Sequence, residues 1–395
     1  MKPIHSTPHL LIATLAVLIG ITAPSALAGT AIPHEATITT GSESEEASVL
    51  DKIWALPVLY EGDDPYIQKI AIIGRYQGQY AWADSNRGEY NDWINRRFRL
   101  GTKINFLQNF EFETQLNLKR VYSRPGRFFR NFDTLFITWE PSDDFYLQVG
   151  QHKPKVTQEY ATSSKYILTF ERSLLVAQTI PAKIGGVTVG GNYKGYDYSL
   201  GIFSGALSRD WLLPEFTGGI ATLASLGRDV SDATKIRGDW FFTDGSSGNN
   251  AVRNTKHLIS LNSTNDWGDW GLNTDFLYSR TLDSENLYGI VLMPWVNLTD
   301  KIQAVFRYQF AASGNDTGIR SRALYERLTI DDGGSDRGDR YNAFYAGLTY
   351  YVGGGIWEGK NKHRLKIMNG IEYADLNGPG SQSTWTYIAG IRTFW

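Results

Sequence analysis

The residues best suited to bind a ligand are the basic side chains in "RRFRLGTKINFLQNFEFETQLNLKR", residues 96–120. Apolar residues occupy alternate positions through this stretch, and the positions between them carry Arg, Lys, Asn, Gln and Glu. A period of two predicts β-strands that have one apolar and one charged face. A face rich in arginine can bind carboxylate or phosphate oxygens, because the planar guanidinium presents several donors in a fixed fork.

A short turn at residues 107–109 fixes how the two strands of this stretch pair. Phe106 then lies opposite Phe110, and the apolar and polar faces both remain consistent along the hairpin. On the polar face Lys103 lies opposite Glu113, and we expect this acid to neutralise it.

The remaining cations of the polar face have no such partner in this register. Arg99 faces only Asn117, so we expect its charge to be available. Arg97 lies opposite Lys119, and like charges in this position are destabilising unless an anion or solvent lies between them. Arg75, on the preceding strand, falls on the same face. The sequence therefore predicts a basic cluster that can attract anions; the alternative is a solvated face with arginines at the level of lipid headgroups.

Composition and the N-terminus limit the kind of protein that carries this cluster. The chain has 395 residues, of which 42% are hydrophobic and 13% aromatic, and no cysteine. The apolar run Leu10–Ile21, followed by Ala26 and Ala28, predicts a secretory signal peptide over residues 1–28, with a buried N-terminal helix as the alternative. No later apolar run reaches the roughly 20 residues of a spanning helix. The formal net charge of −2 argues against nucleic acid as a partner.

An acidic segment, residues 29–66, follows the signal peptide. Within "SEEASVLDKIWAL" the apolar residues have helical spacing, which predicts a short amphipathic helix with Ser44 as its N-cap and Pro57 as its stop. This segment could be a plug, a periplasmic extension or an oligomer contact.

From Ile67 onward the hydrophobic period is two through most of the chain. Fourteen strands can be placed clearly, and residues 206–254, which contain "KIRGDWFFT", could hold two more. Short turns alternate with longer polar segments, such as residues 84–95 and 313–339, and the chain ends in an aromatic residue. An even strand number with short turns at one rim is typical of transmembrane barrels. We therefore predict an all-β, transmembrane, antiparallel up-and-down β-barrel over residues 67–395, of 14 strands, or of 16 if the ambiguous region holds two.

A barrel in lipid turns its apolar face outward, and its backbone groups are all paired around the closed sheet. With 14 to 16 strands the lumen is too wide for side chains to fill, so we expect it to hold water. The charged face then lines this lumen, where basic residues favour the passage of anions. The predicted pore-lining and anion-binding residues are Arg75, Arg97, Arg99, Lys119 and Arg307.

The segment "KPKVTQEYATSSKYILTFERSLLVAQTIP", residues 153–181, is too apolar for a solvated outer loop. Folding back into the lumen would bury its apolar residues and narrow the pore, whereas a membrane-distal lid is the alternative. In the first arrangement Glu159 and Glu171 supply counter-charges. The basic residues that would line the constriction are Lys153, Lys155, Lys165 and Arg172.

Three stretches of the chain resemble the phosphate-selective porin O and P family of outer-membrane channels. They are "RRFRLGTKINFLQNFEFETQLNL", "DDFYLQVGQHKPKVTQEYATSSKYILTFERS" and the terminal "YIAGIRTFW". The resemblance extends loosely over residues 67–395 and implies a 16-stranded barrel of the bacterial outer membrane, commonly trimeric. It also implies a constricting third outer loop and an arginine-lined lumen. Because Glu111 and Glu113 also point inward, a preference for phosphate over other anions stays open.

The sequence gives little support to an enzyme. His34, His152, His257 and His363 are scattered over different elements, and no catalytic triad, metal-ligand, nucleotide or cofactor pattern is present. We therefore predict a passive diffusion channel that prefers anions, phosphate or polyphosphate among them, without metal or cofactor. The expected partners are small anionic solutes, outer-membrane lipid and two further copies in a homotrimer. The alternatives are a general non-specific porin for small hydrophilic solutes and an outer-membrane barrel enzyme.

Overall fold

The computed structural model describes residues 49–118, 129–205, 216, 218–244, 255–282, 285–321, 324–330, 335–352 and 364–395. All of them belong to one compact unit, Thr39–Trp395. The predicted signal peptide at residues 1–28, the predicted cap Ser44, Lys119 and His363 lie outside the described residues.

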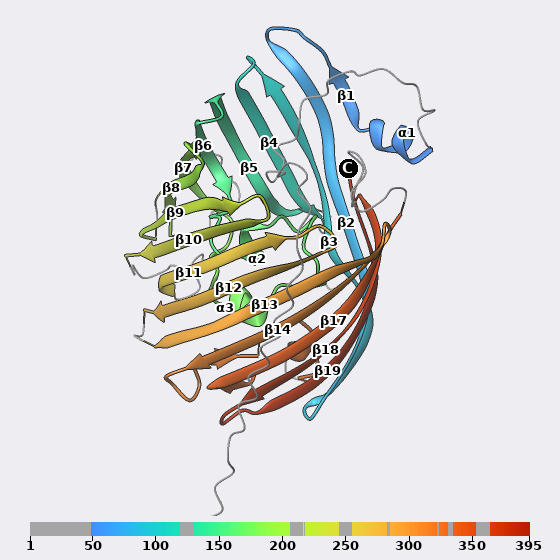
Figure 1. The fold of residues 1–395 in the computed structure, drawn as a ribbon, viewed down its shortest axis with the longest axis vertical. Helices are drawn as coiled ribbons and strands as arrows, with labels where there is room; N and C mark the ends of the chain where they lie inside the picture. Colours follow the sequence, from blue (N-terminus) through green and yellow to red (C-terminus); the bar gives the residue numbers. More distant parts are fainter. Residues whose placement is uncertain are drawn as a thin grey trace, which may run out of the picture. The chain divides into compact units, whose positions relative to one another are not determined.

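Sixteen strands form a closed antiparallel barrel (Figure 1), which confirms the predicted fold. In chain order they are β2 (Ile67–Ser85), β3 (Gly88–Phe106), β4 (Phe110–Leu118), β5 (Phe129–Ser142), β6 (Phe145–His152), β7 (Ile184–Tyr193), β8 (Tyr196–Ser204), β9 (Ile220–Ser231), β10 (Thr234–Thr243), β11 (Thr255–Asp266), β12 (Trp270–Thr281), β13 (Asn286–Thr299), β14 (Ile302–Ser313), β17 (Arg340–Tyr351), β18 (Leu365–Asn377) and β19 (Gln382–Phe394). Each strand pairs with the next barrel strand along the chain, and β19 pairs with β2 to close the sheet. The two strands that the ambiguous region could hold are β9 and β10.

One predicted loop proved to be strand. Residues 84–95 were expected to form a long polar connection, but β3 begins at Gly88, and Ser85 pairs directly with Gly88 across a tight turn. The polar side chains in this stretch, such as Asn91 and Asp92, suggest a loop because they resemble turn residues. They remain compatible with a strand whose backbone is fully paired, because water solvates side chains beyond the bilayer.

The predicted register of the first hairpin is confirmed. Phe106 pairs with Phe110, Lys103 with Glu113 and Arg99 with Asn117. The pairing of β2 with β3 contains a feature that periodicity did not predict: Gln77 pairs with Arg97, but the next residue, Gly78, pairs with Asn95. Arg96 is therefore the extra residue of a β-bulge, and such a bulge re-aims the side chains around it.

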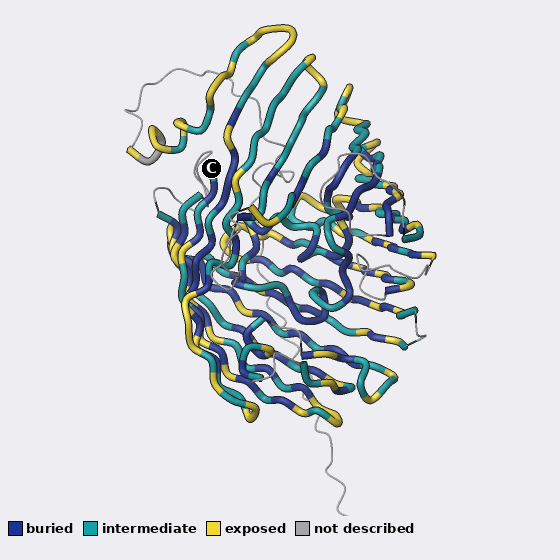
Figure 2. Tube along the Cα trace, turned by 180° about the vertical axis from the view of Figure 1, so that it is seen from behind, coloured by how far each residue is buried: buried dark blue, intermediate teal, exposed yellow. Residues whose placement is uncertain are grey.

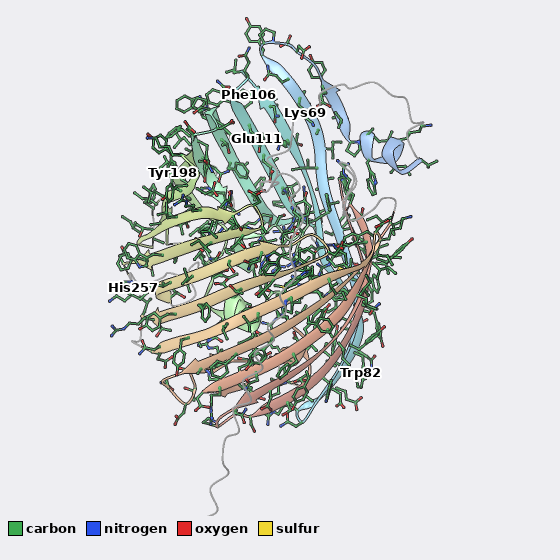
Figure 3. The ribbon with its side chains drawn as sticks, viewed as in Figure 1. Lys69, Trp82, Phe106, Glu111, Tyr198 and His257 are labelled. Carbon is green, nitrogen blue, oxygen red and sulfur yellow. The ribbon has the colours of Figure 1, made fainter. Side chains whose placement is uncertain are left out.

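The apolar face of the barrel is the outer one. Phe306 and Trp385 are 52% and 50% exposed on this face. Arg307, the residue after Phe306, is buried on the lumenal side. Figure 2 shows the same alternation of buried and exposed residues along the strands, and Figure 3 shows Trp82 on the outside of the wall. Among the described residues, no helix is long and apolar enough to cross a membrane.

The lumen is not the open water-filled space that strand number alone led us to expect. The connection between β6 and β7 lies inside it, with the short helices α2 (Gln158–Ala161) and α3 (Leu174–Thr179) visible within the barrel in Figure 1. The connection between β14 and β17 contains β15 (Ile319–Arg320), α4 (Leu324–Leu328) and β16 (Arg337–Gly338), and α4 contacts β2, β3 and β19. Both connections bury apolar side chains that would be poorly solvated outside the barrel.

Two elements precede the barrel. The helix α1 (Val49–Ala55) lies where the sequence predicts a short helix, and the strand β1 (Val58–Glu61) was not predicted. The C-terminal Trp395 pairs through its backbone with Gly74, and β1 continues along the same edge of β2 from Ala71 to Lys69. This short strand therefore satisfies backbone groups of β2 that extend past the end of β19.

Candidate functional site in the barrel lumen

Segment 153–183, the connection between β6 and β7, is anchored to the wall at its first helix. Asp239 Oδ2 accepts a hydrogen bond from the backbone N of Thr157 at 2.9 Å, and Asp275 Oδ2 accepts from the N of Gln158 at 2.7 Å. These amides begin α2 and have no partner within the helix. Asp239 and Asp275 lie on β10 and β12, so two wall carboxylates position the start of the segment.

Arg307 is a second anchor. Its Nη2 lies 2.6 Å from Glu372 Oε2 and its Nη1 lies 3.2 Å from Glu159 Oε1. The same Nη1 donates to the carbonyl O of Glu171 at 2.6 Å. Two carboxylates thus balance the charge of Arg307, whose side chain is only 2% exposed. The structure places this predicted pore-lining residue in the lumen, but in a position that holds the segment.

The segment reaches the opposite wall as well. Arg75 Nη1 donates to Ser164 Oγ at 2.6 Å, and Arg392 Nη1 donates to the carbonyl O of Thr169 at 3.1 Å. Lys366 Nζ, from β18, lies 3.4 Å from the carbonyl O of Ile167. With anchors on β2, β10, β12, β14, β18 and β19, the segment crosses the lumen, so the predicted infolding is confirmed and the membrane-distal lid is not observed.

One side of the segment is packed tightly on the wall. Leu174, Leu175 and Val176 of α3 are each at most 1% exposed and belong to an apolar cluster with inner residues of β7 to β14, among them Phe203 and Phe241. This packing excludes water from that half of the lumen. The wall of β2 to β6, on the other side of the segment, is rich in polar and basic inner residues, among them Arg75, Arg97 and Arg99.

The wall of β2 to β6 carries the predicted arginines. Arg75 and Arg99 lie directly opposite each other in the sheet. Contrary to the expectation that its charge is available, Arg99 is paired: its Nη2 lies 2.7 Å from Asp133 Oδ1, and its Nε donates to Asn117 Oδ1 at 2.9 Å. Asp133 also binds Lys183 through its other oxygen. The acid comes from β5, a strand that the hairpin register did not include.

The pairing of Lys103 also needs correction. Its Nζ lies 2.8 Å from Glu111 Oε2, two residues from the expected partner Glu113. The carboxylate of Glu113 accepts from Gln115 Nε2 at 2.7 Å. A long lysine side chain reaches the diagonal neighbour as readily as the residue directly opposite. The charge of Lys103 is balanced as predicted, but Glu111 is its ion-pair partner.

Arg97 differs from its neighbours. Its Nη1 donates to Gln77 Oε1 at 2.6 Å, and among the described residues no carboxylate lies within the 4.0 Å of an ion pair. Its Nε and Nη2 make no hydrogen bond to any described side chain or backbone group. The residue is 7% exposed, so these donors face a narrow, partly desolvated space. This combination is what an anion ligand requires.

The four predicted constriction cations occupy different surroundings. Lys153 Nζ donates to the carbonyl O of Ala161 at 3.0 Å, and Arg172 Nε donates to that of Glu159 at 2.8 Å. Both cations also lie over the ring of Tyr160, at 5.2 and 5.4 Å from its centroid. These contacts hold the backbone of the segment in place.

The other two predicted constriction residues lie apart from this pair. Lys155 is exposed, and Lys165 Nζ lies 5.1 Å from the ring centroid of Phe394. The four residues are thus brought into one lumenal segment but do not form a single ring of charge.

Crowding of like charge is evident on the segment. Burial lowers the pKa of Lys153 well below its usual range, and the nearby Arg172 and Lys183 lower it further. Burial also lowers the pKa of Lys183 to about 8, against the opposing effect of Asp133. An anion between these groups would offset their repulsion.

Some lumenal cations were missed in the sequence. Arg96 Nη2 donates to Glu171 Oε2 at 2.7 Å, although strict alternation would have turned this side chain outward. Burial opposes ionisation of Glu171, but Arg96 and Arg97 outweigh it and lower its pKa to about 2. No local feature of the sequence reveals the bulge at Arg96. By contrast Arg392, on the polar face of the last strand, could have been found by periodicity.

The family model described as "Phosphate-selective porin O and P" matches residues 70–289 of the chain. Comparison with curated protein sequences gives no match.

Solved structures with a similar fold are outer-membrane proteins. The outer membrane channel DcaP of Acinetobacter baumannii superposes with a TM-score of 0.55 at 9% identity, over 85% of this chain and 99% of that chain. OprB of Pseudomonas putida gives 0.56 at 12% identity, over 82% and 94%. OmpF of Salmonella typhi, solved in complex with daunomycin, gives 0.56 at 12%, over 86% and 100%. At these identities the likeness concerns the fold.

Proposed function

This chain belongs to the phosphate-selective porin O and P family, a family of bacterial outer-membrane channels, and we propose that its lumen conducts anions in preference to cations. The observation that supports the proposal most directly is Arg97. It lies on the inner face of β3, with two guanidinium nitrogens unbonded and no carboxylate within ion-pair distance among the described residues.

The surroundings of Arg97 strengthen the argument. Arg96, Arg99 and Arg172 lie near it, with Glu171 as the nearby acid, and Asp133 is shared between Arg99 and Lys183. Positive charge therefore exceeds negative charge on this side of the lumen. In a narrow, poorly hydrated passage the Coulomb interaction is stronger than in bulk water, so this excess lowers the barrier for an anion and raises it for a cation.

A general porin for small hydrophilic solutes is the second candidate. The observation that favours it is that many lumenal cations already have acids as partners. Arg96 pairs with Glu171, and Arg307 pairs with Glu159 and Glu372. In that case the lumen has little net field and selects by size alone.

We propose no catalytic role. His152 is buried on β6, but its Nδ1 lies 2.9 Å from the carbonyl O of Gly150 and its Nε2 lies 2.7 Å from Thr188 Oγ1. Both ring nitrogens are thus engaged by the wall. We also propose that residues 1–28 are a signal peptide, that residues 29–66 form a periplasmic segment and that the working unit is a homotrimer in outer-membrane lipid.

Conductance in a planar bilayer tests the proposal. With a salt gradient across a bilayer that contains the purified protein, the reversal potential should have the sign expected of an anion-selective channel. Added phosphate should reduce the chloride current. A cation-selective reversal potential would overturn the anion preference, and an unselective one would favour the general porin. The absence of any conductance would overturn the channel itself.

A further inference from the structure

The outward face of β10 to β13 carries an apolar row near one rim. The register aligns one residue from each strand, all between 40% and 49% exposed. The row consists of Trp240, Ile259, Tyr278 and Tyr288. Aromatic side chains at this position are typical of the boundary between hydrocarbon and headgroups.

The next row toward the same rim is basic at its centre. In register, Phe242 lies opposite His257, His257 opposite Arg280, and Arg280 opposite Asn286. Lys256 precedes His257 at a shift in the pairing of β11 with β12, and both Lys256 and Arg280 are exposed. Figure 3 shows His257 at the edge of the barrel wall. Lys256 and Arg280 therefore lie immediately above the apolar row, at headgroup level.

These cations have no ion-pair partner in the described part of the chain. Neither Lys256 nor Arg280 forms an ion pair or a side-chain hydrogen bond there, and the imidazole of His257 contacts only rings, with Phe242 at 5.1 Å between centroids. The neighbouring acid Glu285 accepts instead from Asn315 Nδ2 at 2.7 Å. Exposed cations above an apolar wall are suited to phosphate, which accepts several charge-assisted hydrogen bonds.

We propose that Lys256, His257 and Arg280, above the apolar row, form a binding site for the phosphorylated headgroup of an outer-leaflet lipid. The rim is the one opposite the chain's C-terminus and carries the long connection after β10, so it faces outward by the loop rule for such barrels. The apolar row directly below would contact the acyl chains of the same lipid. A free phosphate ion would leave that row unused.

A protein partner fits this surface less well. Charged residues are depleted from the buried centres of protein interfaces, whereas here they occupy the centre of the row. The site is also separate from the lumen, because the intervening inward residues Leu258 and Leu277 are at most 4% exposed. It therefore does not depend on the proposed anion preference of the channel.

Binding of lipid A, compared with its dephosphorylated form, tests the site. The full chain in an uncharged detergent would be titrated with each lipid, and bound copies counted by native mass spectrometry. We expect the phosphorylated form to bind more tightly, and Arg280→Gln and Lys256→Gln each to weaken it about fivefold. His257→Asn should have a smaller effect, because the asparagine amide still offers a hydrogen-bond donor at this position.

Arg340→Gln is the matched control. Arg340 is also exposed at the same rim, with a side chain that is 66% exposed, but Asp339 lies 4.0 Å away. We expect this variant to bind lipid A as the unaltered chain does. Near-ultraviolet circular dichroism and resistance to unfolding by detergent on heating would show that all the variants are folded.

Several outcomes would overturn the site. One is equal affinity for the two lipids, and another is unaltered lipid A affinity in the Arg280 and Lys256 variants. A third is an equal loss of lipid A affinity in Arg340→Gln, and a fourth is full displacement of lipid A by millimolar inorganic phosphate. The last would show that the row takes phosphate without lipid. Conductance and reversal potential should be unchanged in the Arg280 and Lys256 variants, which separates this test from that of the channel.

Discussion

Segment 153–183 makes different contacts in the two halves of the lumen. On the side of β7 to β14, α3 packs Leu174, Leu175 and Val176 into an apolar cluster, so the segment acts as part of the core. On the side of β2 to β6, the segment presents Lys153 and Arg172 toward a wall of arginines. The difference shows that a wide barrel can combine an apolar cluster that fixes a loop with a neighbouring wall that is rich in charge.

Removing the anchor between the two halves should have the largest effect. Arg307→Ala leaves the buried Glu159 and the partly exposed Glu372 without their cation, and breaking a buried pair costs about 3–5 kcal/mol. We expect the segment to detach from the wall, so that single-channel conductance rises and anion preference falls. Asp375→Asn, an outward carboxylate on β18, is the control. Unchanged conductance in Arg307→Ala would show that the segment is held without this anchor.

Weakening the apolar half should be the next largest effect. Leu175 is 0% exposed, and truncating a buried leucine to alanine costs about 2–5 kcal/mol. We expect Leu175→Ala to make segment 153–183 more accessible to protease while the barrel remains resistant. Leu226→Ala removes the same atoms from a side chain that is 56% exposed on the outer face, and should change little. Equal proteolysis of the two variants would contradict the packing argument.

Altering the charged half tests the assignment of Arg97. A hydrogen bond from a charged donor contributes about 1.5–3 kcal/mol, so Arg97→Gln should weaken phosphate block roughly tenfold or more. Arg99→Gln should have a smaller effect, because Asp133 already balances Arg99. Both are measured as block of chloride current in a planar bilayer. A larger loss in Arg99→Gln would reverse their order and place the anion nearer Asp133.

The smallest expected effect is a pH dependence of the docking of α4 inside the barrel. Burial raises the pKa of Glu326, on α4, from 4.5 to about 8, although hydrogen bonds from Tyr341 and Ser321 Oγ favour the charged form. Because the docked helix binds the proton more tightly than the undocked one, docking is strongest below pH 4.5 and weakens as pH rises toward 8. Hydrogen exchange at residues 324–328 would measure this loss.

The groups that face Glu326 from neighbouring elements include Glu372, which raises its pKa further, and Arg307, which lowers it. Glu326→Gln has no proton to lose, so its exchange rates, corrected for intrinsic pH dependence, should not follow the same curve. If the variant and the unaltered chain show the same profile, Glu326 does not control the docking of α4.

The errors in the site have a common physical cause. Arg99 was expected to be free because the hairpin register relates only two strands, whereas its partner Asp133 lies on a third. Arg96 was missed because a bulge shifts the alternation by one residue. Charges in a lumen are paired across the fold, so two-strand periodicity predicts which face a side chain occupies but not which acid it meets.

The sequence by itself determined the closed antiparallel barrel, its apolar outer face, the register of the first hairpin and the return of segment 153–183 into the lumen. These follow from local alternation and from the cost of leaving apolar residues in water. The tertiary structure alone decided which cations are neutralised, where β1 continues the edge of β2 and which half of the lumen is packed. Those features depend on distances between segments far apart in the chain, and such distances exist only once the barrel has closed.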